Sequence, residues 1–266
     1  MKGSPGWFER SLRVLTQKLT GVRLLQLSRI EPQSAPIEKV SDFPILVDAS
    51  RWLDMNRTER MDALDTTGIF PPDRQAFHRA RYEFALPYVT NLEVADIACG
   101  LGYGCRILKQ GGAKTVVGID SCKDAVDYAR AIHQPAGVRF ECADATRTAL
   151  PSLSMEMITC FETIEHVPNT TELLSEFARI LKPPGQLIIS SPNDWGLTQH
   201  HCHSWTPFEF MTEVAAHFEI ESIWEQYSFS AGQNYRHPLG IKAWAEETEA
   251  QAECLIIVAR KKDARD

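Results

Sequence analysis

The chain has 266 residues, of which 44% are hydrophobic and 24% charged, and its formal net charge is −7 at pH 7. These values are typical of a soluble globular protein, and the length fits one domain of about 200 residues with an extension. No apolar run approaches the roughly 18 residues of a transmembrane helix, and the start of the chain lacks the apolar core and cleavage site of a secretory signal. We therefore exclude an integral membrane protein and expect a cytoplasmic one.

Cysteine usage and charge distribution narrow the class of protein further. The seven cysteines are odd in number and form no C-x-x-C pair, so we expect free thiols in a reducing compartment rather than a disulfide framework or a zinc finger. Residues 1–30 carry six basic side chains and one acidic side chain, which leaves a strongly acidic remainder. Because an acidic body binds a phosphate backbone poorly, we do not expect a nucleic-acid partner.

The first expected element is a basic amphipathic helix within residues 1–30. Its apolar positions recur at alternating steps of four and three: Phe8, Leu12, Leu15, Leu19 and Val22. This helix could pack on its own domain or on a partner, lie on an anionic membrane surface as a peripheral contact, or be an organelle-targeting segment. Residues 31–72, with the stretches EPQSAP and GIFPPD, are expected to be a linker of irregular structure.

Helices and strands alternate over residues 73–262. The expected helices are 74–89, 123–132, 171–181 and 206–218, and the expected strands are 93–98, 115–120, 138–144, 156–162, 186–191, 218–228 and 252–260. This alternation, with continuous apolar strands, predicts a Rossmann-like, doubly wound α/β fold with a mostly parallel seven-stranded sheet and helices on both faces. At the last helix, Thr206 and Glu209 have the spacing of a capping box, and Pro207 suits the first helical position.

A glycine cluster, CGLGYG, follows the strand at 93–98. Its glycines, at positions 100, 102 and 104, would let the backbone turn tightly and approach a ligand. The spacing G-x-G-x-G differs from the dinucleotide fingerprint, which argues against a nicotinamide oxidoreductase, and the Walker A lysine of a P-loop is absent too. Asp96, Asp120 and Asp144 lie at or near the ends of the first three strands of this region, so they converge on the edge where open α/β sheets bind ligands. Taken alone, Asp120 or Asp144 could instead be a helix N-cap.

Five segments resemble, in order and spacing, the motifs of class I S-adenosylmethionine-dependent methyltransferases: VADIACGLGYG, VVGID, CADA, MITCFETIEHV and LLSEFARILKPPGQLIISSPN. The resemblance covers about Arg79 to Arg260 and implies S-adenosylmethionine as cofactor. Ala98 stands where many members have glycine, a change that we expect the loop to tolerate.

The resemblance also implies roles for individual residues. The methionine portion of the cofactor would lie on Ala98, Gly100 and Gly102 and beside Phe161, its carboxylate would meet Arg81, its ribose Asp120, and its adenine Asp144 and Ala145. The full set implied to bind the cofactor is Arg81, Asp96, Ala98, Gly100, Gly102, Asp120, Ser121, Asp144, Ala145 and Phe161. A guanidinium suits a carboxylate because it can form two parallel hydrogen bonds with it.

Residues 161–167, FETIEHV, place Glu162, Glu165 and His166 after the fourth strand. The pattern E-x-x-E-H, followed by a histidine four residues before W-T-x-x-E-F, resembles the terminal 2′-O-methyltransferases of small RNAs, which bind magnesium through two glutamates and two histidines. Carried over, the metal ligands would be Glu162, Glu165, His166 and His201, with His203 as the alternative to His201. The E-x-x-E-H half also resembles ubiquinone-biosynthesis O-methyltransferases, and related motifs occur in sugar methyltransferases.

We therefore expect an O-methyltransferase acting on a hydroxyl of a small molecule, a sugar, a glycan or lipid-linked precursor, or a phenol. Mg²⁺ would assist by holding two neighbouring oxygens, and Glu162, His166 and His201 are the catalytic candidates. Without a metal, His166 or His201 could act as a general base, or the cluster could be structural. An RNA 2′-O-methyltransferase and a non-catalytic cofactor-binding scaffold are the alternative functions, and the sequence leaves the oligomeric state open.

Overall fold

The computed structural model describes residues 60–66, 70, 72–227, 240–245 and 252–262. The chain divides into two units, Met1–Ile37 and Glu38–Asp266, and every described residue belongs to the second unit. The helix expected within residues 1–30, and the expected linker as far as residue 59, therefore lie outside the described residues. None of the described helices is long and apolar enough to cross a membrane.

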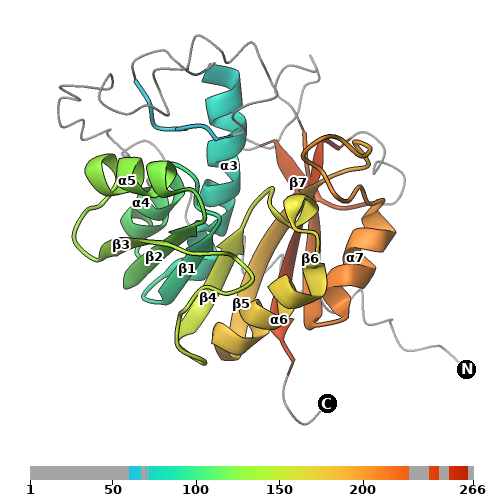
Figure 1. The fold of residues 1–266 in the computed structure, drawn as a ribbon. Coiled ribbons are helices and arrows are strands. Elements are labelled where there is room, and N and C mark those ends of the chain that lie inside the picture. The colour runs from blue at the N-terminus through green and yellow to red at the C-terminus, as the bar shows by residue number, and fades with distance from the viewer. Residues whose placement is uncertain (1–59, 67–69, 71, 228–239, 246–251, 263–266) are drawn as a thin grey trace, which may run out of the picture. The chain divides into compact units, whose positions relative to one another are not determined.

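Eight strands form one mixed sheet in the order β3-β2-β1-β4-β5-β8-β6-β7 (Figure 1). Their bounds are β1 Glu93–Ile97, β2 Thr115–Asp120, β3 Val138–Cys142, β4 Met155–Cys160, β5 Leu181–Pro192, β6 Phe218–Gln226, β7 Ile241–Ala243 and β8 Cys254–Lys261. Strands β1 to β5 pair in parallel, whereas β8 pairs antiparallel with both β5 and β6, and β7 antiparallel with β6. The predicted α/β fold with a mostly parallel sheet is confirmed, with an eighth strand, β7, that is too short to show a periodic pattern in the sequence.

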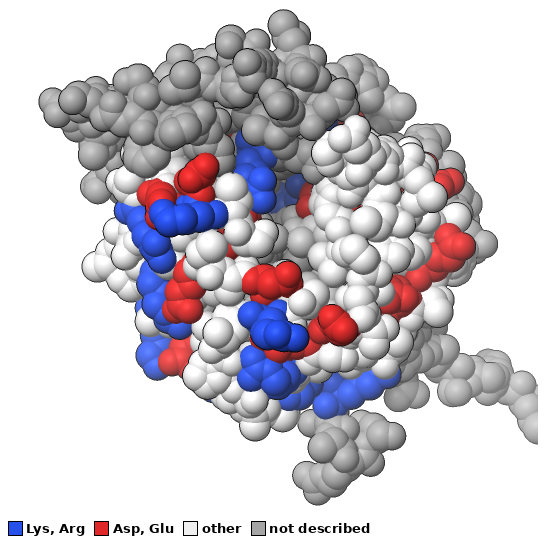
Figure 2. Space-filling model, viewed as in Figure 1, with Lys and Arg blue, Asp and Glu red and all other residues white. Residues whose placement is uncertain are grey.

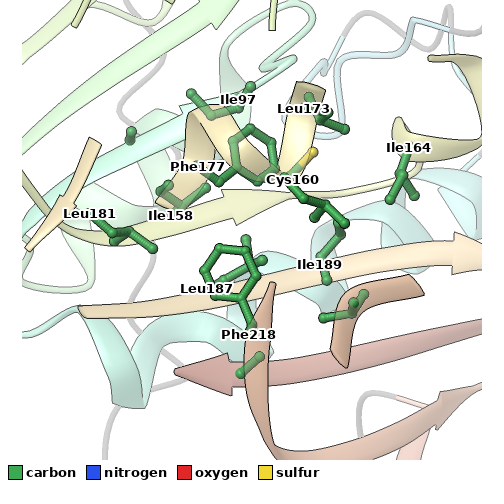
Figure 3. Close-up of a cluster of buried hydrophobic side chains, with 14 of the residues drawn as sticks. Ile97, Ile158, Cys160, Ile164, Leu173, Phe177, Leu181, Leu187, Ile189 and Phe218 are labelled. Carbon is green, nitrogen blue, oxygen red and sulfur yellow. The ribbon is translucent and has the colours of Figure 1, made fainter. Parts of the chain in front are cut away.

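The helices cover both faces of this sheet. They are α3 Pro72–Val89, α4 Tyr103–Gln110, α5 Lys123–Ile132, α6 Thr170–Ile180 and α7 Pro207–Ala215, with a 3₁₀ turn, η4, at Ile164–His166. One face packs under α6 and α7, and Figure 3 shows Leu173 and Phe177 of α6 among the side chains of Ile97, Ile158 and Cys160. Helices α3, α4 and α5 lie on the other side of the sheet (Figure 1).

Helix α7 begins as its sequence predicts. The hydroxyl of Thr206 accepts a hydrogen bond from the Glu209 amide, and the Glu209 carboxylate accepts one from the Thr206 amide at 2.8 Å. Pro207 occupies the first helical position, where its missing amide hydrogen costs nothing. The predicted capping box is therefore confirmed, and it sets the end of the loop over residues 193–206 that carries the histidines.

Strand order determines where a ligand can bind. The chain runs from β1 to β2 and β3 on one side of β1 and then crosses over to β4 on the other side, so the strand order reverses at β1 and a crevice for a ligand forms at its carboxyl end. Helix α4 starts directly after Gly102, whose φ of +85° lies in the left-handed region. A Cβ on Gly102 would lie 2.5 Å from Ala129 of α5, so glycine is needed both for the turn and for the close packing of α4.

The segment before α3 packs against the fold. Met61 and Phe70 are 8% and 1% exposed and form a small cluster with Leu101, Ala125 and Tyr128. These two residues fall within the stretch that the sequence assigns to a linker. Their contacts with α5 and the glycine loop place residues 60–66 beside the ligand edge of the sheet.

Candidate active site

A cavity of about 540 Å³ opens at the carboxyl ends of the parallel strands. Its walls come from the loop after β1, the ends of β2 and β3, the residues after β4 as far as the start of α6, one side of α3, and residues 60 and 61. Most of the residues predicted to bind the cofactor line it: Arg81, Ala98, Gly100, Asp120, Ser121, Asp144, Ala145 and Phe161. Asp96 and Gly102 do not line it.

Asp120 ends β2 and is only 4% exposed. One of its carboxylate oxygens accepts the Gly100 amide at 2.9 Å, and the other accepts the Cys122 amide at 2.9 Å and the Arg60 guanidinium at 3.2 Å. These donors fix the orientation of the carboxylate at the cavity wall. A fixed carboxylate at the end of β2 is the group that such folds use to accept hydrogen bonds from ribose hydroxyls.

Asp144 follows β3 and is exposed at the rim of the cavity. Its Oδ1 accepts hydrogen bonds from the Thr146 hydroxyl at 2.7 Å and the Thr146 amide at 2.8 Å. Because the side-chain hydrogen bond and then the backbone hydrogen bond favour the charged form, they lower the pKa of Asp144. Asp144 therefore remains an acceptor near neutral pH.

Asp96 lies beneath the glycine loop rather than in the cavity. It is 1% exposed and accepts hydrogen bonds from the hydroxyls of Thr159, at 2.7 Å, and Tyr82, at 3.2 Å, and from the Cys105 thiol at 3.3 Å. Burial raises the pKa of this carboxyl to about 6, against the opposing effect of these hydrogen bonds. In this structure Asp96 supports the loop from below, and its predicted contact with the cofactor stays a prediction.

Arg81 is buried in α3, at 3% exposure, and reaches the cavity. Its Nε donates to Gln226 at 2.8 Å, its guanidinium lies 3.5 Å from the Glu162 carboxylate, and the Phe77 ring lies beneath it. Burial, the largest single effect, lowers the pKa of Arg81, but the Glu162 charge together with the neighbouring Cys254 and Tyr103 outweighs it, and the pKa is raised. Arg81 is thus a fixed cation in the cavity wall.

Two residues of the cavity have strained backbones. Ala98 and Glu162 have φ values of +58° and +48°, in the left-handed region that costs an ordinary side chain about 1–2 kcal/mol. Strain of this kind gathers where the surrounding structure enforces it for function. Ala98 thus adopts a conformation that glycine adopts more readily, and its predicted tolerance in the place of glycine stays a prediction.

Three of the four predicted metal ligands lie together. Glu165, His166 and His201 each offer a ligand atom, and these atoms lie within 4.8 Å of one another. The Nδ1 of His166 donates to the His200 carbonyl at 2.9 Å, which directs Nε2 to the side of Glu165, 3.8 Å from Oε1. An imidazole whose second nitrogen is fixed by a backbone carbonyl is the arrangement found for metal-binding histidines.

Glu162, the fourth predicted ligand, is placed elsewhere in this structure. Its Oε1 accepts the Ser190 hydroxyl at 2.7 Å and its Oε2 faces Arg81. The backbone conformation at Glu162 turns its side chain toward β5 and α3, whereas Glu165 lies in the next turn, η4. The described cluster is therefore a carboxylate with two imidazoles.

His201 and His203 are distinguished by their surroundings. The imidazole of His203 donates to the Val167 carbonyl at 3.0 Å and stacks on Trp205, with ring centroids 4.8 Å apart. His201 instead packs edge-on against His166, also at 4.8 Å. The geometry favours His201, as the ungapped motif does.

The cavity also contains residues that the sequence did not single out, among them Arg60, His78 and Tyr103. His78 lies three residues before Arg81, on the same side of α3, and burial, then the charges of Arg81 and Arg74, lower its pKa to about 3. Helical spacing from Arg81 could have identified His78. Arg60 lies in an irregular segment, where no periodicity indicates which way a side chain points.

Comparison with known proteins bears on this site. Residues 95–189 match the family model described as a methyltransferase domain. The ubiquinone biosynthesis O-methyltransferase of Coxiella burnetii is 31% identical over 102 residues, which cover 38% of this chain and 43% of that protein. A protein of Mycolicibacterium smegmatis, named as a probable S-adenosylmethionine-dependent methyltransferase, is 27% identical over 154 residues, which cover 54% and 58% of the two chains.

Solved structures share the fold. The crystal structure of an S-adenosylmethionine-dependent methyltransferase from Mesorhizobium loti superposes with a TM-score of 0.56 at 21% identity, covering 71% of this chain and all of that one. The chain spans about half the length of the curated relatives that it matches. The comparisons therefore show a match to a methyltransferase domain over residues 95–189, a range that contains the glycine loop, Asp120 and Asp144, and an α/β fold shared with solved methyltransferase structures.

Proposed function

We propose that the chain transfers a methyl group from S-adenosylmethionine to a hydroxyl oxygen of a small molecule, a sugar or glycan precursor, or a phenol. The observation that carries the proposal is the cavity, because it gathers the ends of four parallel strands with Asp120, Asp144 and Arg81 in its walls. The cofactor supplies an electrophilic methyl group on a sulfonium. The name of the Coxiella relative supports an oxygen acceptor.

The residues of the cavity fit such a cofactor. Asp120 would accept hydrogen bonds from the ribose hydroxyls, and Asp144 with Ala145 would bind the adenine. Arg81 would donate to the methionine carboxylate from its place beside Glu162, because a guanidinium has five N–H donors and can serve both groups. The small side chain of Ala98 would leave room for the methionine portion.

His166 is the residue best placed to act on the acceptor. It lines the cavity, and the His200 carbonyl holds the proton on Nδ1, so Nε2 is the nitrogen that can take a proton from a hydroxyl. His201 and Glu165 lie against it and would orient it or stabilise its positive charge. Glu162 would act indirectly, through Arg81.

A divalent metal is a further part of the proposal. Two imidazoles and one carboxylate suit manganese, iron, cobalt or zinc, whereas Mg²⁺ prefers oxygen ligands. Glu165, His166 and His201 would hold the ion, which would lower the pKa of a bound hydroxyl. With the ion bound, Nε2 of His166 would be a ligand, so the ion would take the place of His166 as the group that activates the hydroxyl. The proposal therefore includes these transition-metal ions as well as the Mg²⁺ predicted from the sequence.

The surface favours a small acceptor over RNA. On the described part of the face in Figure 2, basic side chains lie beside acidic ones rather than gathering into one broad area. An RNA partner would be expected to meet a basic surface. A membrane-borne acceptor, approached through the basic residues 1–30, remains part of the proposal.

Isothermal calorimetry with S-adenosylhomocysteine, followed by titration with Mn²⁺ and Mg²⁺, tests these assignments. We expect cofactor binding, and Mn²⁺ binding that is lost in His201→Ala but kept in His203→Ala, the matched control from the same loop. Transfer of labelled methyl to a catechol, a monophenol and a sugar would then identify the acceptor class. Absence of S-adenosylhomocysteine binding would overturn the proposed function, whereas cofactor binding without any Mn²⁺ or Mg²⁺ signal would overturn only the metal and leave His166 as the base.

A further inference from the structure

The segment of residues 60–66 is fixed to the fold by a buried carboxylate. Asp62 is 1% exposed; its Oδ2 accepts the Tyr128 hydroxyl and the His133 imidazole, both at 2.8 Å, and its Oδ1 accepts the Leu64 amide at 2.8 Å. His133 is itself 2% exposed. A buried carboxylate with a partner on each oxygen has little freedom, so Asp62 locks this segment onto α5.

The same segment is also joined to α3. The side-chain amide of Gln75 donates to the Asp62 carbonyl at 3.1 Å and to the Asp65 carbonyl at 2.8 Å. Met61 packs against Leu101 of the glycine loop. The segment is thus held by both α3 and α5, and its position does not depend on a single contact.

Arg60 directly precedes these anchors and lines the cavity beside Asp120. Its guanidinium is 3.2 Å from Asp120 Oδ1, and its Cγ lies 4.0 Å from the point where a Cβ on Gly100 would be. The side chain is 37% exposed, and Asp120 is its hydrogen-bond partner among the described residues. A guanidinium carries five N–H donors, so a single bond to Asp120 leaves others for a ligand.

The pair formed by Arg60 and Asp120 complements a vicinal diol. Each ribose hydroxyl can donate one hydrogen bond and accept others, so a carboxylate and a guanidinium side by side can satisfy both properties. Asp120 alone can only accept from the diol. Asp120 would accept hydrogen bonds from the hydroxyls, and Arg60 would donate hydrogen bonds to their oxygens. The pair would therefore favour a ribose with hydroxyls over a deoxyribose of the same shape.

We propose that Arg60 is a cofactor-binding residue that donates to the ribose hydroxyls beside Asp120, positioned by the Asp62–His133 anchor. This inference rests on the proposed function, since it concerns the same cofactor. Arg60 would reach the ribose from the segment before α3, whereas the other contacts come from residues at the ends of the parallel strands. The segment thereby becomes a wall of the cofactor site.

The test measures how Arg60→Ala changes the preference of the full-length chain for a ribose with hydroxyls. Adenosine and 2′,3′-dideoxyadenosine serve as calorimetric probes, because neither carries the methionine portion that would contact Arg81. We expect Arg60→Ala to weaken the binding of adenosine about tenfold, which is the lower end of the range for a charge-assisted hydrogen bond. The affinity for the dideoxy compound should stay unchanged. Arg74→Ala, which removes a 49% exposed arginine paired with Glu253, is the matched control and should change neither affinity.

Three results would overturn the inference. Equal losses for both nucleosides would make Arg60 a structural residue only, and tighter adenosine binding in Arg60→Ala would make it a competitor of the ribose for Asp120. Unchanged affinities for both would remove any role in binding. Failure of the wild-type chain to bind S-adenosylhomocysteine would instead refute the proposed function, so the two failures are distinguishable.

Discussion

Asp96 illustrates how a buried acid beneath the site affects stability. Burial raises its pKa to about 6 from 3.8, so below about pH 4 the carboxyl is protonated in both the folded and unfolded chain. As the pH rises from about 4 to 6, the unfolded chain loses this proton first. We therefore expect the contribution of Asp96 to the free energy of unfolding to fall by up to about 3 kcal/mol across this window.

Urea unfolding at pH 4, 5 and 6 measures this effect, with Asp96→Asn as the comparison. The amide cannot ionise, so the variant should lack the slope that Asp96 gives the wild type. Asp62 acts in the opposite sense and at lower pH. Burial, the largest single effect, raises its pKa, but the hydrogen bond and charge of His133 together with the hydrogen bonds from Leu64 and Tyr128 lower it. The stabilisation from Asp62 is present above pH 3.8 and is lost as the pH falls below that value. His78, whose pKa burial lowers to about 3, gives a slope opposite to that of Asp96 over the same window, so the effect of Asp96 is the difference between the wild type and Asp96→Asn. Parallel slopes for both proteins would contradict the prediction.

The positions of residues at strand ends were predictable from the sequence, whereas the orientation of Glu162 was not. Asp120 and Asp144 lie where the carboxyl ends of β2 and β3 bring them, which the alternation of elements fixes. Glu162 also follows a strand, but its φ of +48° and its partners on α3 and β5 direct it to Arg81. Such partners are distant in sequence, so no local pattern reports them.

At the scale of elements, the contact between α3 and α4 depends on a glycine. A Cβ on Gly104 would lie 2.0 Å from the ring of Tyr82, which is held edge-on between Tyr103 and Phe161 and hydrogen-bonded to Asp96. The neighbouring rings and the hydrogen bond to Asp96 hold the Tyr82 ring in place, so either this ring must give up these contacts or α4 must shift. We expect Gly104→Ala to lower the free energy of unfolding by about 3 kcal/mol, measured by urea denaturation.

The control for this variant is Gly196→Ala. Gly196 has a φ of +81° and nothing within 4 Å of an added Cβ, so the substitution should cost only the backbone strain, about 1 kcal/mol. Because Tyr82 lines the cavity, Gly104→Ala should also weaken S-adenosylhomocysteine binding, whereas Gly196→Ala should not. Equal destabilisation in the two variants would show that the clash is relieved at no cost.

Elements with a local signature were predictable from the sequence, and those without one were not. The capping box of α7 rests on residues three apart and was confirmed, as were the buried strands β1, β2 and β8. Strand β7 has three residues and exists only through its pairing with β6. Residues 60–66 are irregular, and their place follows from tertiary contacts of Asp62 and Met61 with α5.

At the scale of the whole molecule, the described part of the second unit is one sheet with a layer of helices on each face. The cavity lies where the strand order reverses, so a ligand there contacts segments from residue 60 to residue 172. The fold class was predictable because alternation of helices and strands is a property of the entire chain. The arrangement of charges inside the cavity was not, since it depends on which distant side chains meet.

Cofactor binding should therefore stabilise the whole unit rather than one loop. A ligand that binds only the folded chain, present at about a hundred times its dissociation constant, adds about 2.7 kcal/mol to the free energy of unfolding. We expect S-adenosylhomocysteine at that concentration to raise the melting temperature, as measured by differential scanning calorimetry. Asp120→Asn should lose most of this increase, because a neutral amide accepts ribose hydroxyls poorly, whereas Asp127→Asn, which removes an exposed acid paired with Lys123 on α5, should keep it. An increase that survives Asp120→Asn unchanged would place the ribose away from β2 and would contradict the site derived from the strand ends.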